Sequence, residues 1–348
     1  MNNTKIEICF NNWDYKNASR VSHIIWSVCG FLFTMLGIPG NIFVILIMSN
    51  KTNRKGSTSL YWTAIAICEI IFLTGVFWIW CVGMSIVKID PREIFSCGVF
   101  YSILMGPTIS SNLYLASMSI DRVFMILHPI RYRIMDTRRH VIMRMLLIFI
   151  IVILLMFPLN FYFYYDSKTT IFICEFYTHI DQWKIRVWPF IHAILFVLCP
   201  SILTCIAAVI ILRNRYDHRK KQKNKLSESA RQMERNSVVL LCISIAILFS
   251  LLPTVILQIF IVHDLLLNHE SLCPKRWKTY RILVNWFWIL SVFVYSCKFY
   301  IRLFISKTFR KDFLKLIHCT FRQEQNDNEQ NFISLNDQNK TKIADAEI

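Results

Sequence analysis

The sequence predicts an all-α membrane protein, built as a seven-transmembrane helix bundle with an extracellular N-terminus and a short amphipathic eighth helix. Three observations lead to this prediction. Of the 348 residues 55% are hydrophobic and the mean hydropathy is +0.44, which is too apolar for a soluble domain of this length. Seven apolar runs are each long enough to cross the hydrocarbon core of a bilayer as a helix. The basic residues gather in alternate loops between these runs, as in proteins that cross a membrane repeatedly.

The apolar runs define the expected spans in chain order. They cover approximately residues 24–48, 60–82, 95–127, 141–165, 188–212, 238–262 and 280–305. The fifth and sixth runs contain Pro200 and Pro253. A membrane helix tolerates proline because neighbouring helices satisfy the carbonyl group that proline leaves without a donor. The polar stretch 213–235 is expected to extend the fifth and sixth helices around a solvated loop.

The chain divides into four expected segments. Residues 1–23 form an N-terminal tail, 24–305 the bundle, and 320–348 a disordered tail rich in Asn, Gln and acidic residues. The family resemblance given below implies that residues 306–319 form an amphipathic helix on the membrane surface. The first 20 residues are polar and the first apolar run is too long for the core of a signal peptide. We therefore expect no cleaved signal.

The formal net charge of +17 is segregated rather than spread over the chain. Basic clusters lie at residues 51–55, 131–139, 213–235 and 307–315, whereas the other loops mix both signs. The positive-inside rule makes the basic loops cytoplasmic, with the N-terminus outside and the C-terminus inside. This pattern indicates topology and not nucleic-acid binding, although the basic loops can also bind anionic lipid headgroups. Asn2 and Asn17 begin sequons in the outer tail and are predicted glycosylation sites.

The third run ends in Asp121-Arg122-Val123, which Pro129 and a basic loop follow. Cys97 lies 25 residues before Arg122. At ~1.5 Å of rise per residue this spacing is about 37 Å, enough to place the two residues at opposite membrane surfaces. The arrangement resembles the third helix of a rhodopsin-like (class A) G protein-coupled receptor, whose Asp-Arg-Tyr motif reads Asp-Arg-Val here.

The resemblance extends over roughly residues 24–318. Matching features are Asn41 after Gly40, Glu69 in place of the second-helix aspartate, Pro200, Pro253 and the Ser306–Phe313 stretch, which resembles the eighth helix. Two motifs depart from the family. The sixth-helix Cys-Trp-x-Pro reads Ser250-Leu251-Leu252-Pro253, and the seventh-helix Asn-Pro-x-x-Tyr reads Lys298-Phe299-Tyr300-Ile301-Arg302. The resemblance implies a divergent, peptide-receptor-like member with an altered activation relay.

The resemblance also assigns the outward cysteines. It implies a disulfide between Cys97 and Cys174, and a second between Cys9 and Cys273 as in some peptide-binding members; the alternative for the second is a free Cys9. Cys319 follows the eighth helix and is either a palmitoylation site or an ordinary tail cysteine. No cysteine or histidine spacing indicates a metal site, and no cofactor is expected.

Two ionisable residues lie deep inside the expected bundle. Glu69 is about twelve residues, or roughly 18 Å, from the inner end of its helix, and Lys298 is about nine residues, or roughly 14 Å, from Lys307. In the family the corresponding positions help to coordinate sodium. We predict an internal Glu69–Lys298 ion pair near Ser111 that replaces the metal ion, because a lone charge in the membrane costs about 2.5–3.5 kcal/mol. The alternative is that Lys298 extends to the inner leaflet while Glu69 is protonated or hydrated.

By resemblance, the G protein contacts the inner face around Arg122. Asp121 is expected to hold Arg122 in the resting state, beside Val123. Glu234, near the base of the sixth helix, is a second candidate for this restraint, although its register is one residue from the usual position.

The outer half of the bundle is expected to line the ligand pocket. Leu104 stands where amine receptors carry an aspartate, and Val292 where opsins carry a lysine, so these two ligand classes are disfavoured. The candidate pocket residues are Leu104, Met105, Thr108, His192, Thr254, Gln258, Asn285 and Trp288. An apolar wall with few polar groups suits a peptide or a lipid; for each residue, helix packing is the alternative role.

The predicted function is that of a plasma-membrane receptor that couples an extracellular ligand, with a neuropeptide favoured, to a heterotrimeric G protein. One alternative keeps the fold as a decoy receptor with weak or no coupling. Another is a transporter or channel, against which stand the absence of an internal repeat and the few polar groups within the runs. An enzyme is not expected, because no nucleophile–base set or phosphate-binding loop occurs.

Overall fold

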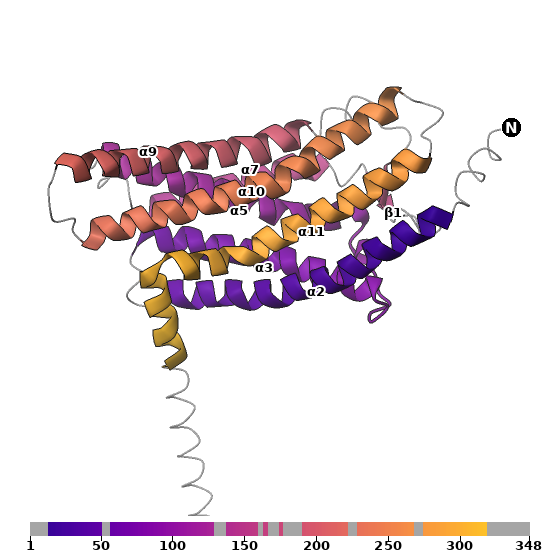
Figure 1. Cartoon of the computed structure of the whole chain (residues 1–348), viewed down its shortest axis with the longest axis horizontal. Coiled ribbons are helices and arrows are strands. Elements are labelled where there is room, and N and C mark those ends of the chain that lie inside the picture. Colours follow the sequence, from indigo (N-terminus) through magenta and orange to yellow (C-terminus); the bar gives the residue numbers. More distant parts are fainter. Residues whose placement is uncertain are drawn as a thin grey trace, which may run out of the picture.

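The computed structural model describes residues 13–50, 56–128, 137–158, 163–165, 174–176, 190–221, 228–267 and 274–318. Its long helices run side by side along the length of the molecule (Figure 1). They are α2 (Trp13–Ser49), α3 (Ser57–Gly83), α5 (Cys97–Leu127), α7 (Arg138–Met156), α9 (Cys199–Lys221), α10 (Glu228–Leu267) and α11 (Pro274–Ile305). The short helix α4 (Pro91–Ile94) precedes α5, and residues 307–318 form a last helix that turns away from the bundle (Figure 1).

Helix α5 lies at the centre of the bundle. It packs against α3, α7 and α9, whereas α2 packs against α3 and α11, and α10 against α9 and α11. Five helices of the described part are long and apolar enough to cross a membrane, namely α2, α3, α7, α10 and α11. Helix α5 carries many buried polar residues, among them Ser110, Ser111 and Asn112. Neighbouring helices surround these side chains, so the central helix needs less apolar surface than the outer ones.

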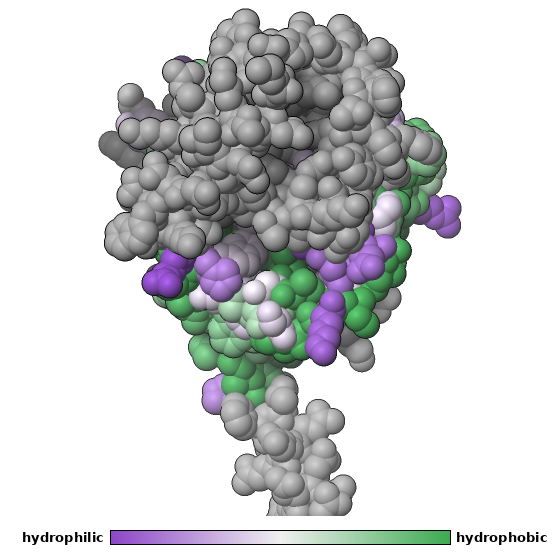
Figure 2. All heavy atoms as spheres, turned by 90° about the vertical axis from the view of Figure 1, so that its right-hand side faces the viewer, coloured by the Kyte–Doolittle hydropathy of each residue, from purple (hydrophilic) through white to green (hydrophobic). Residues whose placement is uncertain are grey.

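Apolar side chains also cover the outside of the bundle. Helix α7 buries only Val141, Val152 and Met156 and exposes Leu146, Leu147 and Leu154. Figure 2 shows an extensive hydrophobic surface on the described flank of the bundle, with hydrophilic residues near the end that faces the viewer. A surface of this kind is stable in lipid and not in water.

The fourth expected span was placed too far along the chain. The prediction reached residue 165, but α7 ends at Met156, and Phe163–Tyr165 form strand β1, which pairs antiparallel with β2 (Cys174–Phe176). Pro158 explains the early end, because proline has no N–H to donate and its ring crowds the carbonyl group one turn earlier. The all-α prediction therefore omits this short hairpin.

Two other helices differ from their expected runs. Helix α2 begins at Trp13, eleven residues before the apolar run, so residues 13–23 of the expected N-terminal tail are helical. Residues His192–Leu198 form a π-helical stretch, η2, immediately before α9. Pro200 lies just after this stretch, and the wider turns of η2 relieve the crowding between its ring and the preceding carbonyl groups. As expected, α9 and α10 extend into the polar stretch 213–235.

Gly37 allows α2 to approach both α3 and α11. A Cβ atom at this position would lie 2.6 Å from Ser296 Oγ and 2.7 Å from Leu73 Cδ1. Both are closer than packed side chains permit, and Leu73 itself is fully buried. Close approach of α2 to its neighbours thus requires glycine here.

We expect Gly37→Ala to lower the free energy of unfolding by about 1–3 kcal/mol, because overpacking would push α2 away from α11. The thermal unfolding midpoint of the purified protein in detergent measures this effect. Gly83→Ala is the matched control, since a Cβ atom there would have no neighbour within 4 Å. Equal midpoints for the two variants would contradict the packing role of Gly37.

Candidate functional site

A buried ion pair joins α3 to α11 in the interior of the bundle. Lys298 Nζ lies 2.5 Å from Glu69 Oε1, and the side chains are 3% and 1% exposed. Ser111 of α5 donates a hydrogen bond of 2.9 Å to the same carboxylate oxygen, and Lys298 Nζ donates to Ser111 Oγ at 3.3 Å. Three helices therefore meet at one charged cluster. The ammonium group also lies 4.7 Å from the centre of the Tyr295 ring, a cation–π contact that further offsets its burial.

A second polar layer surrounds this cluster. Asn112 of α5 donates a hydrogen bond of 3.3 Å to the Tyr295 hydroxyl group. Asn41 of α2 donates to the Gly37 carbonyl group at 3.1 Å, and its side chain also interacts with the Glu69 carboxylate. The other carboxylate oxygen, Glu69 Oε2, is buried and has no hydrogen-bond partner. Glu69 Oε2 can therefore accept a further hydrogen bond, for example from a water molecule.

The sodium ion that the family resemblance implies does not fit this cluster. The ammonium group of Lys298 already neutralises the Glu69 carboxylate. In the described part of the chain, no group of three or more Asp, Glu, His or Cys side chains could hold a metal ion. A second cation beside Lys298 would be repelled by its charge in a surrounding of low dielectric constant.

Asp121 lies near the end of the central helix, in a network that includes residues of two other helices. Its carboxylate accepts a hydrogen bond of 2.8 Å from the Tyr61 hydroxyl group of α3, and a charged one from the Arg144 guanidinium group of α7. The Tyr61 hydroxyl group is also 3.0 Å from Ser117 Oγ. Asp121 thus connects three helices, and its predicted contact with Arg122 stays a prediction. The sequence analysis did not predict Tyr61 or Arg144 as partners of Asp121. Arg144 could have been noticed as a basic residue one turn inside an apolar run.

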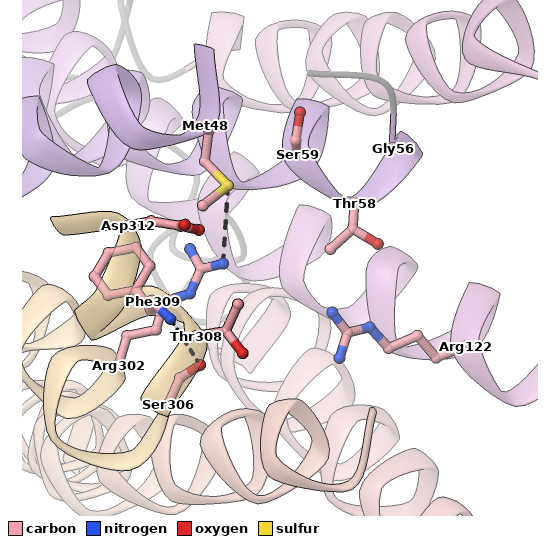
Figure 3. Close-up of a pocket in the computed structure, with 10 residues that line it drawn as sticks. All are labelled: Met48, Gly56, Thr58, Ser59, Arg122, Arg302, Ser306, Thr308, Phe309 and Asp312. Atoms are coloured by element: carbon pink, nitrogen blue, oxygen red, sulfur yellow. Dashed lines mark hydrogen bonds between the residues drawn. The ribbon is translucent and has the colours of Figure 1, made fainter. Parts of the chain in front are cut away.

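Arg122 follows Asp121 and lines a pocket at the same end of the bundle, here called the Arg122 end. The pocket has a volume of about 230 Å³ and lies between the ends of α2, α3, α5 and α11 and the last helix. Arg302 enters the pocket from the side opposite Arg122 (Figure 3). Arg122 and Arg302 are 6% and 8% exposed. The pocket was not predicted, although the sequence showed an arginine where the family has a tyrosine.

Val123 and Glu234 are the other two residues predicted to contact the G protein at this end. Val123 is half-buried on α5 next to Arg122. Glu234 lies on α10, and its side chain falls outside the described ones.

At the opposite end, here called the Cys97 end, the structure brings four predicted ligand residues together. Leu104, Met105 and Thr108 are buried on α5, and Trp288 of α11 packs against the hydrophobic clusters of Leu104 and of Met105. The Thr108 hydroxyl group donates to the Met105 carbonyl group at 2.8 Å. The remaining candidates lie on helices, but their side chains fall outside the described ones: His192, Thr254, Gln258 and Asn285.

Cys97 is disulfide-bonded at the start of α5. Its predicted partner, Cys174, lies on β2 with a side chain outside the described ones, so this pairing stays a prediction. Asn17 lies on α2, and its side chain is likewise not described. The other residues predicted to be modified or cross-linked lie outside the described residues: Asn2, Cys9, Cys273 and Cys319.

Comparison with known proteins places this geometry in a family. The model of the 7 transmembrane receptor (rhodopsin family) matches residues 40–298. Galanin receptor 2a of Danio rerio is 26% identical over 322 residues, which cover 87% of this chain and 80% of that protein. The motilin receptor of Homo sapiens is 25% identical over 118 residues, which cover 34% of this chain and 28% of that protein. The resemblance inferred from the motifs is confirmed, and the chain belongs to the rhodopsin family of seven-transmembrane receptors.

Proposed function

We propose that this chain is a plasma-membrane receptor that transmits the binding of an extracellular peptide to a heterotrimeric G protein. Seven helices cross the membrane, with the Cys97 end outside and the Arg122 end in the cytoplasm. Family membership supports this topology, and so does the segregation of basic loops toward the Arg122 end. The N-terminal tail then lies outside, and residues 320–348 form the cytoplasmic tail.

A peptide is the favoured ligand. The two relatives are by name receptors for galanin and motilin, both of which are peptides. Leu104 and Met105 offer apolar walls at the Cys97 end and no counter-ion for an amine. A lipid remains the second candidate for the same apolar walls. The glycosylation of Asn2 and Asn17, both disulfides and a lipidated Cys319 belong to this proposal.

The observation that carries the coupling proposal is the position of Arg122. It is buried at the end of the central helix, beside a pocket, and its neighbour Asp121 links α3 and α7. Rearrangement of these helices would expose Arg122 to a G protein. A ligand at the Cys97 end acts by binding one arrangement of the helices more tightly than the other. Val123 and Glu234 belong to the same proposed coupling face.

We expect Arg122→Ala to abolish the maximal response to an activating peptide while leaving the amount of receptor at the cell surface unchanged. The full chain is expressed in cells with a promiscuous G protein, and a peptide library supplies the activator. Arg20→Ala, which removes an exposed arginine at the other end of α2, is the control. Full signalling by Arg122→Ala would contradict the coupling proposal. Silence of the wild-type chain with every ligand would favour the decoy alternative.

A further inference from the structure

The pocket at the Arg122 end holds a buried guanidinium group that lacks a complete set of partners. Arg302 is 8% exposed, and its Nη1 atom is buried without a hydrogen-bond partner. The same residue lines the pocket (Figure 3). Burial of a charged donor without an acceptor is costly, so such an atom in the wall of a cavity indicates a ligand that accepts hydrogen bonds.

Two aromatic rings fix the orientation of Arg302, and its Nη2 atom contacts a weak acceptor. Its guanidinium carbon lies 3.9 Å from the centre of the Trp62 ring and 4.7 Å from that of Phe309. Arg302 Nη2 contacts Met48 Sδ at 3.9 Å, and a thioether is a poor hydrogen-bond acceptor. In the folded bundle, the two rings fix the plane of the guanidinium group. The group is therefore preorganised for a partner in the pocket.

The pocket carries an excess of positive charge. Arg122 and Arg302 both line it, and Asp312 is the acidic residue among its lining residues. The Asp312 carboxylate attracts the guanidinium group of Arg302, whereas the guanidinium group of Arg122 repels it. Two guanidinium groups against one carboxylate leave the cavity suited to an anion.

The remaining lining groups match the same ligand. Thr58, Ser59 and Thr308 bring hydroxyl groups to the pocket wall. Guanidinium forks with hydroxyl donors are the usual ligands of phosphate oxygens in proteins. The volume of about 230 Å³ is enough for one phosphate group with several waters, since each water occupies about 30 Å³ in the liquid.

We propose that this pocket binds a phosphate group between Arg302 and Arg122. The phosphate comes either from a soluble phosphate or phosphomonoester, or from the headgroup of a phosphoinositide in the inner leaflet. Arg302 Nη1 donates to one oxygen of this anion. Because the site depends on the folded bundle and not on signalling, binding is measured without a G protein.

The test measures the thermal unfolding midpoint of the full chain in phosphatidylcholine nanodiscs. Inorganic phosphate is titrated at constant ionic strength against potassium chloride. A second arm uses nanodiscs that contain phosphatidylinositol bisphosphate. A ligand that binds the folded state alone raises the midpoint with the logarithm of its concentration. A rise with inorganic phosphate identifies a site for a soluble anion, and a rise with the lipid alone identifies a headgroup site.

Variants separate binding from general damage. We expect Arg302→Gln to raise the half-saturating phosphate or lipid concentration about tenfold or more. Arg310→Gln, an exposed arginine on the last helix outside the pocket lining, should leave it unchanged. Asp312→Asn removes the opposing carboxylate and should lower the half-saturating concentration a few-fold. A structural role for these residues would not make one variant bind more tightly than the wild type.

Two outcomes would overturn the proposal. The first is a wild-type midpoint that changes with neither phosphate nor phosphoinositide. The second is stabilisation that Arg302→Gln and Arg310→Gln reduce equally, which would mean a diffuse effect of surface charge. If Arg302→Gln does not fold, Arg302→Lys and Asp312→Asn decide the question. Lysine keeps the charge but loses the fork, so it should weaken binding, and unchanged binding in both variants would contradict the site.

Discussion

Neutralising either Glu69 or Lys298 alone is expected to lower the free energy of unfolding by about 3–5 kcal/mol, and neutralising both should cost much less. Either single change leaves one charge buried without its counter-ion, because the two side chains are 1% and 3% exposed. The double variant removes both charges together. Glu69→Gln and Lys298→Met preserve the approximate volume of the two side chains, so the comparison measures the interaction rather than a cavity.

Thermal unfolding in detergent and the fraction of receptor at the cell surface both measure this double-mutant cycle. Lys307→Met is the control, since Lys307 is exposed just beyond α11. The wild-type midpoint should also be the same in sodium and potassium chloride, because the ammonium group takes the place of the metal ion. A loss in the double variant equal to the sum of the two single losses would show that the two residues act independently.

The sequence located this ion pair because depth in a membrane helix can be counted from the chain. Glu69 and Lys298 lie at similar distances from one end of their helices, and a charge at that depth requires a partner. Counting residues along the helices did not predict the hydrogen bonds of Ser111, which accepts one from Lys298 and donates one to Glu69. That role depends on the rotation of α5 relative to α3 and α11, which follows from packing and not from spacing.

The same limit applies to the contacts of Asp121 at the Arg122 end. The motif suggested that Asp121 holds Arg122, which stays a prediction. It could not indicate that the Asp121 carboxylate also bonds Tyr61 and Arg144, because these residues lie on other helices. A single residue also changed a helix boundary: Pro158 stopped α7 before the end of its apolar run. Hydrophobic length predicted the existence of the helices, while side-chain direction and proline set the details.

The network around Asp121 offers a second large effect. Arg144 connects α7 to the end of α5 through the Asp121 carboxylate, and Tyr61 connects α3 to the same group. These contacts hold Asp121 within a layer shared by three helices. If the helices separate when the receptor is active, the contacts stabilise the resting arrangement and oppose signalling without ligand.

We expect Arg144→Ala to raise ligand-independent signalling, since it removes the charged partner of a carboxylate that is 9% exposed. A loss of about 1–3 kcal/mol from the resting arrangement shifts the balance between resting and active states by roughly 5- to 150-fold. Partial exposure of Arg144, whose side chain is 40% accessible, places the expected shift toward the lower part of that range. Basal G protein activity per receptor at the cell surface is the measurement.

Arg139→Ala is the matched control, because Arg139 is exposed at the beginning of the same helix. Tyr61→Phe should act in the same direction as Arg144→Ala but more weakly, since it removes a neutral donor and keeps the ring that packs in the core. The two changes should not add fully when combined, because both act through the Asp121 carboxylate. Basal activity that stays at the wild-type level in Arg144→Ala, with normal surface expression, would show that the Asp121 network serves stability alone. Reduced basal activity would show that the network belongs to the active arrangement.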